Sequence, residues 1–309
     1  MAKERVSALR ILRKYFLNFV KWAIGCLYLA IGAPGCKSRI IAFVVHEVGD
    51  NPRDHARLTS TYSTKKNFLK QITLLSDHFD FIDPSKDPLW TNKTGCLITF
   101  DDGYRGSLDA ALVLETKKIS SIHLVNFETI NGKLNSSALL HFSCVEFGTE
   151  LDWKNSTPKN VETLSARLTE SELTRAFDFS GPYLDPAEFK VLTSLTHTVV
   201  GDHFLNHFYG NSLSTEEVIQ NLSFNTQSST STQGIRPYFA APHGELDNLR
   251  IRKIIAQGYE VVFAGSSWTK IGNTYVIPRI DLNNSIKSKF SLFGAIAILL
   301  LKSRIKTRS

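Results

Sequence analysis

Two adjacent carboxylates at the end of a predicted strand are the first residues in the chain that could do chemistry. An apolar run that ends at Phe100 indicates a buried strand, and Asp101 and Asp102 follow it directly, before a glycine that permits a turn. Because side chains alternate along a strand, consecutive aspartates at its tip diverge. One could bind a cation while the other faces a bound water. The alternative is a solvated Asp-Asp-Gly turn without a chemical role.

Two histidines four residues apart form a second candidate group further along the chain. His203 and His207 follow a short β-like run, and imidazoles at positions i and i+4 can converge on one ion. With a carboxylate they would form a mixed His/His/Asp set, which suits zinc or a similar divalent metal and leaves positions open for water and substrate. A pair of surface or packing histidines is the ordinary alternative.

Polar residues also follow two other predicted strands. The run from Tyr238 to Ala241 ends in Pro-His-Gly (242–244), and the β-branched and aromatic run from Arg39 to Val45 ends at His46. Strands alternate with helical patterns along the chain, which is typical of a parallel sheet with helices outside it. In such folds the carboxyl ends of the strands share one face, so we expect these polar residues to gather there.

The three motifs, taken in order, resemble a known family. Thr-Phe-Asp-Asp-Gly (99–103), Gly-x-His-x-x-x-His (201–207) and Phe-Ala-x-Pro-x-Gly (239–244) are similar to the motifs of polysaccharide deacetylases of the NodB-homology type, carbohydrate esterase family 4. The resemblance covers about residues 39–285 and includes the connecting segment Ile-Pro-Arg-Ile-Asp at 277–281. It implies an α/β fold, namely a distorted (β/α) barrel of the NodB-homology type, here with terminal amphipathic helices.

The resemblance also implies roles for individual residues. Asp102, His203 and His207 would bind a divalent metal, with zinc as the expected ion. Asp101 would be the general base. A metal in this position would bind the acetamide oxygen and acidify its water, while the neighbouring carboxylate removes the proton. Asp101 could instead orient a metal ligand.

Two positions depart from the pattern of the family. Ala240 stands where most members have an arginine, and Arg236 is not an obvious replacement. The late Leu-x-His that supplies a general acid is missing, since residues 279–282 read Arg-Ile-Asp-Leu. One branch of the family carries this histidine at the end of the first strand, so His46 is the candidate acid, with a structural histidine as the alternative. We assign substrate contact to the third motif: Pro242, His243 and Gly244. Four histidines have no motif support and are expected to be structural or exposed: His55, His123, His141 and His197.

The net charge of the 309-residue chain is unevenly distributed. Of the total of +7, residues 1–38 contribute +6 and residues 287–309 another +6, which leaves about −5 for the residues between them. The basic character therefore belongs to the two ends. It does not indicate a nucleic-acid groove, and we expect no nucleic-acid partner.

Both basic ends are also apolar. The uncharged stretch 22–35 and the run 293–301 are shorter than the ~20 residues of a spanning helix. Short apolar helices flanked by cations suit a membrane surface with anionic head groups. An uncleaved signal anchor or signal peptide, and helices that simply pack on the domain, are the alternatives. We expect a peripheral protein on the cytoplasmic side of the inner membrane, or a periplasmic one with an uncleaved anchor.

The chain divides into three parts. Residues 1–38 form a basic, apolar, membrane-proximal segment, residues 39–285 form the deacetylase barrel, and residues 286–309 form a basic amphipathic helix. The polar stretch 129–180 is predicted to be an insertion that could shape substrate specificity or cover a barrel wall. Residues 50–64 are predicted to form a loop over the barrel mouth.

Together with the candidate metal ligands, the resemblance implies a metal-dependent hydrolase. It would remove N-acetyl groups from amino sugars of a bacterial surface polysaccharide, such as lipopolysaccharide, or from a lipid-linked precursor. The expected partners are an amino-sugar glycan, either free or linked to a lipid, and a membrane surface. The alternatives are a catalytically altered glycan-binding or scaffold barrel, and a deformylase or amidase that acts on another N-acylated sugar.

Overall fold

The structure is a computed structural model of the chain. It describes residues 2–33, 39–86, 95–150, 153–223, 234–282 and 286–306, and their side chains from residue 15 to residue 304.

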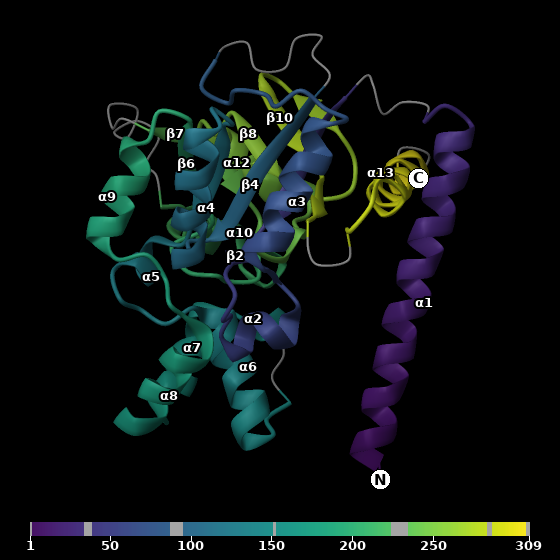
Figure 1. Cartoon of the computed structure of the whole chain (residues 1–309). Coiled ribbons are helices and arrows are strands. Elements are labelled where there is room, and N and C mark those ends of the chain that lie inside the picture. The colour runs from purple at the N-terminus through teal and green to yellow at the C-terminus, as the bar shows by residue number, and fades with distance from the viewer. Residues whose placement is uncertain are drawn as a thin grey trace.

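A nine-stranded sheet forms the centre of the described part of the molecule (Figure 1). The strand order is β11-β1-β4-β5-β6-β7-β8-β10-β9, and every neighbouring pair is parallel except β9 and β10. The strands are β1 (Ile40–Val45), β4 (Gly95–Asp102), β5 (Ser121–Val125), β6 (Thr198–Asp202), β7 (Ile235–Ala240), β8 (Val261–Phe263), β9 (Thr269–Ile271), β10 (Thr274–Ile277) and β11 (Arg279–Asp281). A separate parallel pair joins β2 (Glu47–Val48) to β3 (Tyr62–Ser63). This half-barrel confirms the predicted α/β barrel-type fold.

The register of the sheet aligns the strand ends that carry the motifs. All residues of β1 and β4 are buried, as their apolar sequences predict, and Cys96 lies in this buried part of β4. Asp102 on β4 is level with Val125 on β5, and Val125 is level with Asp202 on β6. Because His203 comes directly after Asp202, the first and second motifs meet at the same edge of the sheet.

Helices connect the strands, as expected from the alternating pattern. They are α3 (Lys65–Ser76), α4 (Arg105–Thr116), α9 (Pro186–Ser194), α10 (Thr215–Gln220) and α12 (Asn248–Ala256). Two of them begin at capping boxes. The Asp185 side chain accepts a hydrogen bond from the backbone N–H of Glu188 at the start of α9, and Ser214 caps α10 in the same way.

A second group of helices lies beyond the carboxyl ends of the strands (Figure 1). We call this group the cap. It consists of α2 (Asp54–Thr59), α6 (Ser136–Phe147), α7 (Pro158–Ser165) and α8 (Glu170–Ser180), and a short helix, α5 (Phe127–Ile130), leads into it. The cap has an apolar core of its own, made by Leu139, Leu140, Phe142, Leu164, Ala176 and Phe179. Three of its helices come from the predicted insertion 129–180.

The prediction of a loop at 50–64 was wrong, because this segment contains α2. One turn and a half of helix is too short to give a periodic signal in the sequence. The helix is held by tertiary contacts instead: Ala56 is fully buried, and α2 packs against α6 and α8 of the cap.

The terminal helices α1 (Ala2–Ala30) and α13 (Lys289–Lys306) cross at two glycines. A Cβ atom on Gly25 would lie 1.8 Å from the carbonyl oxygen of Phe290, and one on Gly294 would lie 1.9 Å from that of Lys21. Any larger residue would therefore force the two helices apart.

The two terminal helices differ in what they bury. The apolar side of α13, including Leu292 and Ile296, is buried against the domain, as one of the alternatives above proposed. Much of α1 instead extends away from the domain (Figure 1). Among the described residues, no helix combines the length and the apolarity needed to cross a membrane.

Candidate metal centre and active site

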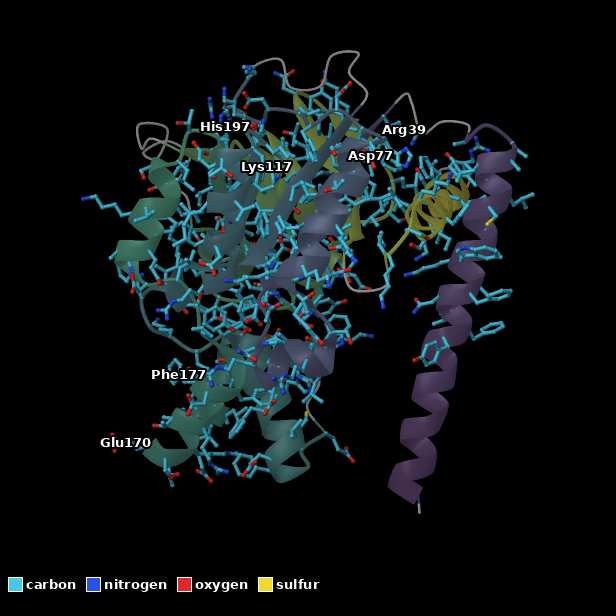
Figure 2. The ribbon with its side chains drawn as sticks, viewed as in Figure 1. Arg39, Asp77, Lys117, Glu170, Phe177 and His197 are labelled. Atoms are coloured by element: carbon cyan, nitrogen blue, oxygen red, sulfur yellow. The ribbon has the colours of Figure 1, made fainter. Side chains whose placement is uncertain are left out.

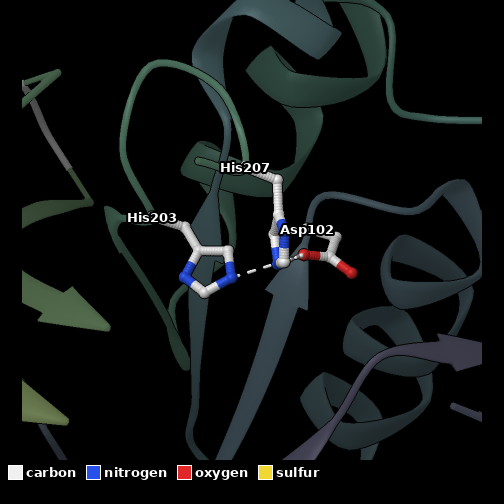
Figure 3. Close-up of side chains that lie close together, drawn as sticks. All are labelled: Asp102, His203 and His207. Atoms are coloured by element: carbon white, nitrogen blue, oxygen red, sulfur yellow. Dashed lines mark ion pairs between the residues drawn. The ribbon is translucent and has the colours of Figure 1, made fainter. Parts of the chain in front are cut away.

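The structure brings together the three residues predicted to bind a metal. Asp102 ends β4, and His203 and His207 follow β6 (Figure 3). Asp102 Oδ1 lies 3.3 Å from His203 Nε2 and 3.1 Å from His207 Nε2. All three side chains are buried, and one ligand atom from each lies within 4.8 Å of the others.

Hydrogen bonds on the far side of each ring orient the two histidines. Nδ1 of His203 donates to the backbone carbonyl of Ala240 at 2.9 Å, which leaves the lone pair on Nε2. Nδ1 of His207 lies 2.9 Å from the hydroxyl of Ser137, a residue of the cap. The Asn126 side-chain amide also donates to the backbone carbonyl of His203 and so fixes the loop that carries it. Such contacts set the tautomer and the direction of a metal-binding imidazole.

The chemistry of this donor set fits a divalent cation. Among the described residues, the buried atoms Asp102 Oδ1 and His203 Nε2 have no hydrogen-bond partner. Buried polar atoms are normally paired, so two such atoms 3.3 Å apart are suited to bind one cation together. One carboxylate oxygen and two imidazole nitrogens also leave positions open for water and substrate.

Asp101 forms a bidentate ion pair with Arg279, and its Oδ2 also lies 3.7 Å from His203 Nε2. Nη1 and Nη2 of Arg279 donate to Oδ1 and Oδ2 of Asp101, both at 2.6 Å. Nη1 also contacts the Thr99 hydroxyl at 3.1 Å. Arg279 lies on β11, which pairs with β1 at one end of the sheet order. The sequence contains Arg279 in a segment that resembles the family, but the pattern assigned it no role.

Electrostatics keep both aspartates ionised. Burial opposes the charge on Asp101, but Arg279 and His203 outweigh burial and hold the pKa of this carboxyl below its ordinary value. Burial likewise opposes the charge on Asp102, and the two histidines nevertheless hold its pKa well below the ordinary value. A carboxylate able to accept a proton therefore lies next to a carboxylate able to bind a cation.

The backbone is left-handed at three non-glycine residues of the site. The φ angles are 71° at Asp102, 64° at Phe204 and 61° at His243. Each such conformation costs about 1–3 kcal/mol and persists where the surrounding structure imposes it. All three positions lie in the predicted motifs; Asp102 and His243 line one cavity, whereas Phe204, which stands between the two histidines of the second motif in the sequence, packs in the apolar core.

His46 and His243 line the same cavity as Asp102 and His207. His46 lies between β1 and β2, and its buried Nδ1 has no hydrogen-bond partner among the described residues. His243 Nε2 lies 3.0 Å from the Ser137 hydroxyl, and its ring is 4.6 Å from that of His207. Pro242 is buried beside it, and Gly244 has a φ of 71°. The catalytic and substrate-binding roles of these residues stay predictions.

Several residues of the cavity had no signal in the sequence. Trp153, Ser137 and two histidines, His55 and His141, come from α2 or from the insertion. We expected these histidines to be structural or exposed, but the fold places both of them in the cavity. His123 is buried and stacked on Phe100, and His197 lies at the end of the sheet opposite the cap (Figure 2).

Solved structures share this fold. IcaB from Ammonifex degensii superposes with a TM-score of 0.53 at 16% sequence identity, over 84% of this chain and 97% of that protein. The polysaccharide deacetylase BC0361 from Bacillus cereus superposes with a TM-score of 0.50 at 12% identity, over 84% of this chain and 69% of that protein. The chain has the fold of these proteins. No protein-family sequence model and no curated protein sequence matches it.

Proposed function

We propose that the protein is a metal-dependent deacetylase that hydrolyses the N-acetyl group of an amino sugar. The observation that carries the proposal is the buried Asp102–His203–His207 triad next to the ionised Asp101. Support comes from the fold, which is shared with a polysaccharide deacetylase. A scaffold barrel without activity is less consistent with the site, because Arg279 supplies the cation that position 240 lacks.

The residues around the triad can perform both proton transfers of amide hydrolysis. A divalent metal held by Asp102, His203 and His207 would polarise the acetyl carbonyl and acidify a water. Asp101 lies beside the triad, with its Oδ2 3.7 Å from His203 Nε2, and would accept the proton of the attacking water as the general base. His46 lines the same cavity and would donate a proton to the leaving amine.

We propose zinc as the metal. Two imidazole nitrogens and one carboxylate oxygen are a donor set common in catalytic zinc sites, which keep an open position for water. The same donors also bind other divalent metals of the first transition series, with an affinity that differs from one ion to the next. Elemental analysis of the purified protein would identify the ion.

We also propose that α1 holds the protein at a membrane surface, on the cytoplasmic side of the inner membrane, where it would act on a lipid-linked precursor of a surface polysaccharide. The support is a set of large apolar side chains that α1 and the residue after it leave exposed: Tyr15, Phe16, Phe19 and Leu27 on the helix, and then Ile31. Cations lie around them in the sequence of both ends. Apolar side chains and cations together are typical of helices that bind anionic membranes. Flotation with anionic and with neutral vesicles tests this part, and equal recovery of a chain without residues 1–38 would contradict it.

Acetate release tests the proposed activity. The purified protein should release acetate from N-acetylated oligosaccharides, should lose this activity after treatment with a chelator, and should regain it when a divalent metal is added. Asp102→Ala and His207→Ala should lose both metal and activity while their circular dichroism stays unchanged. Activity that survives removal of all metal would overturn the proposal. Release of formate in place of acetate from matched substrates would identify a deformylase.

A further inference from the structure

A cavity of about 500 Å³ lies between the cap and the carboxyl ends of the strands. The strand side provides metal-site residues, including Asp102 and His207. The opposite wall comes from the cap and the segment within it: His55, Leu58, His141, Cys144 and Trp153. A substrate that reaches the triad through this cavity therefore passes between the sheet and the cap. Residues outside the motifs would decide which substrate fits.

Trp153 gives this wall a fixed aromatic surface. Its ring lies 4.4 Å from that of His243 at an interplanar angle of 33°, and the ring of Tyr209 meets it edge-on at 4.8 Å. Sugar rings carry faces of C–H groups that pack against aromatic rings, and tryptophan offers the largest such surface. Because its neighbours already hold the indole in place, a sugar would bind without the cost of ordering it.

Two histidines from different parts of the cap form a polar pair in the same cavity. Nδ1 of His55 on α2 lies 3.3 Å from Nδ1 of His141 on α6, and the ring of Phe179 packs against both. Burial lowers the pKa of His55 to about 3 and also lowers the pKa of His141, so both rings are neutral at physiological pH. If one Nδ1 donates to the other, one Nε2 remains an acceptor and the other a donor. Sugar hydroxyl groups pair with such a set.

We propose that the space beneath the cap is a binding subsite for one terminal N-acylated amino sugar, with Trp153 against its ring and the His55–His141 pair on its hydroxyl groups. The inference rests on the proposed function and names the substrate class of that site. A cavity of about 500 Å³ is the size that encloses a small ligand. A chain end or a single sugar on a carrier can enter it. Because the sheet bounds this cavity on one side and the cap on the other, we expect an internal sugar of a long polymer to enter it less readily.

The pattern of products tests the subsite. N-acetylglucosamine oligosaccharides of increasing length are treated with the full-length, metal-loaded protein, and mass spectrometry locates each free amine. Terminal residues alone should lose their acetyl groups. Comparable rates at internal residues would overturn the subsite while the proposed function stands. A parallel assay with N-acetylglucosamine on a polyprenyl diphosphate, held in vesicles, distinguishes a sugar on a lipid carrier from a glycan chain end by comparing kcat/KM.

Variants of the cap test which residues form the subsite. Trp153→Ala should raise KM at least about tenfold, equivalent to about 1.4 kcal/mol, with kcat and metal content unchanged, and Trp153→Phe should restore part of the loss. Phe177→Ala is the matched control, because this aromatic residue lies on the outer side of the cap and is 41% exposed (Figure 2). An unchanged KM in Trp153→Ala would overturn the assignment.

Binding of N-acetylglucosamine to the metal-loaded Asp101→Asn variant separates the subsite from the reaction. Calorimetry should detect binding that Trp153→Ala weakens in the same background. Binding of this kind without acetate release from any substrate by the native protein would support the subsite and overturn the proposed function. Absence of both binding and acetate release would overturn both.

Discussion

Replacement of Arg279 by glutamine should raise the pKa of Asp101 and slow catalysis. In the native protein two hydrogen bonds of 2.6 Å join the guanidinium to the carboxylate, and the two side chains are only 7% and 3% exposed. Removal of one partner of a buried ion pair costs about 3–5 kcal/mol, because the other charge stays buried without compensation. If about 3 kcal/mol of this penalty destabilises only the ionised form of Asp101, the pKa of Asp101 rises by about two units.

The sign of the effect follows from the role of Asp101. A general base acts when it is ionised, so activity falls as the pH drops through its pKa. In Arg279→Gln the acid limb of the pH profile of acetate release should therefore move up by about two pH units. At pH values above the pKa that Asp101 has in the unfolded chain, the ion pair also stabilises the fold. This contribution is lost as the pH falls through the lower pKa that Asp101 has in the folded protein. Urea unfolding should show a large loss of stability at neutral pH and a smaller one in acid.

Two further variants make the test specific. Arg236→Gln is the control, since the Arg236 side chain donates to the Ser85 carbonyl at 3.1 Å, in an exposed position, and should change neither measurement. In an Asp101→Asn background, loss of Arg279 should cost less stability than in the native protein, because no buried charge is left behind. An acid limb and a stability equal to those of the native protein in Arg279→Gln would refute this reasoning.

Three other predictions follow from the packing and hydrogen bonds of single residues. Ser137→Ala should weaken metal affinity about 10–100-fold in competition with a chelator, because the hydroxyl orients a metal-site imidazole, whereas Ser143→Ala on the same helix should not. Gly25→Leu should separate the two terminal helices and speed proteolysis of α1, while the exposed Ala30→Leu should have no such effect. Burial raises the pKa of Glu47 to about 7, so the free energy of unfolding should fall as the pH rises from about 4.5 to 7, by up to about 3 kcal/mol. Urea unfolding measures this change, and Glu47→Gln should remove it.

Strand-end chemistry could be predicted from the sequence because it is local. An apolar run that ends in a polar residue marks both the strand and its tip, and parallel strands bring their tips together. This reasoning predicts that Asp102, His203 and His207 lie at one edge of the sheet, and the structure confirms their proximity. The order of the motifs supplied the remaining information on the fold.

Contacts between distant segments could not be predicted in this way. Arg279 reaches Asp101 because β11 and β4 both flank β1, an arrangement that no spacing in the sequence reveals. His55 and His141 meet because α2 and α6 pack in the cap, and α2 is too short for a periodic pattern. The ion-pair partner of Asp101 and the residues of the cap that line the cavity therefore came from the structure.

Anomalous X-ray diffraction from crystals of the metal-loaded protein, measured at the absorption edge of the bound ion, shows directly whether the triad binds a metal. We expect one strong peak within bonding distance of Asp102 Oδ1, His203 Nε2 and His207 Nε2. A peak at other side chains, or an active protein with no peak at these three atoms, would contradict it.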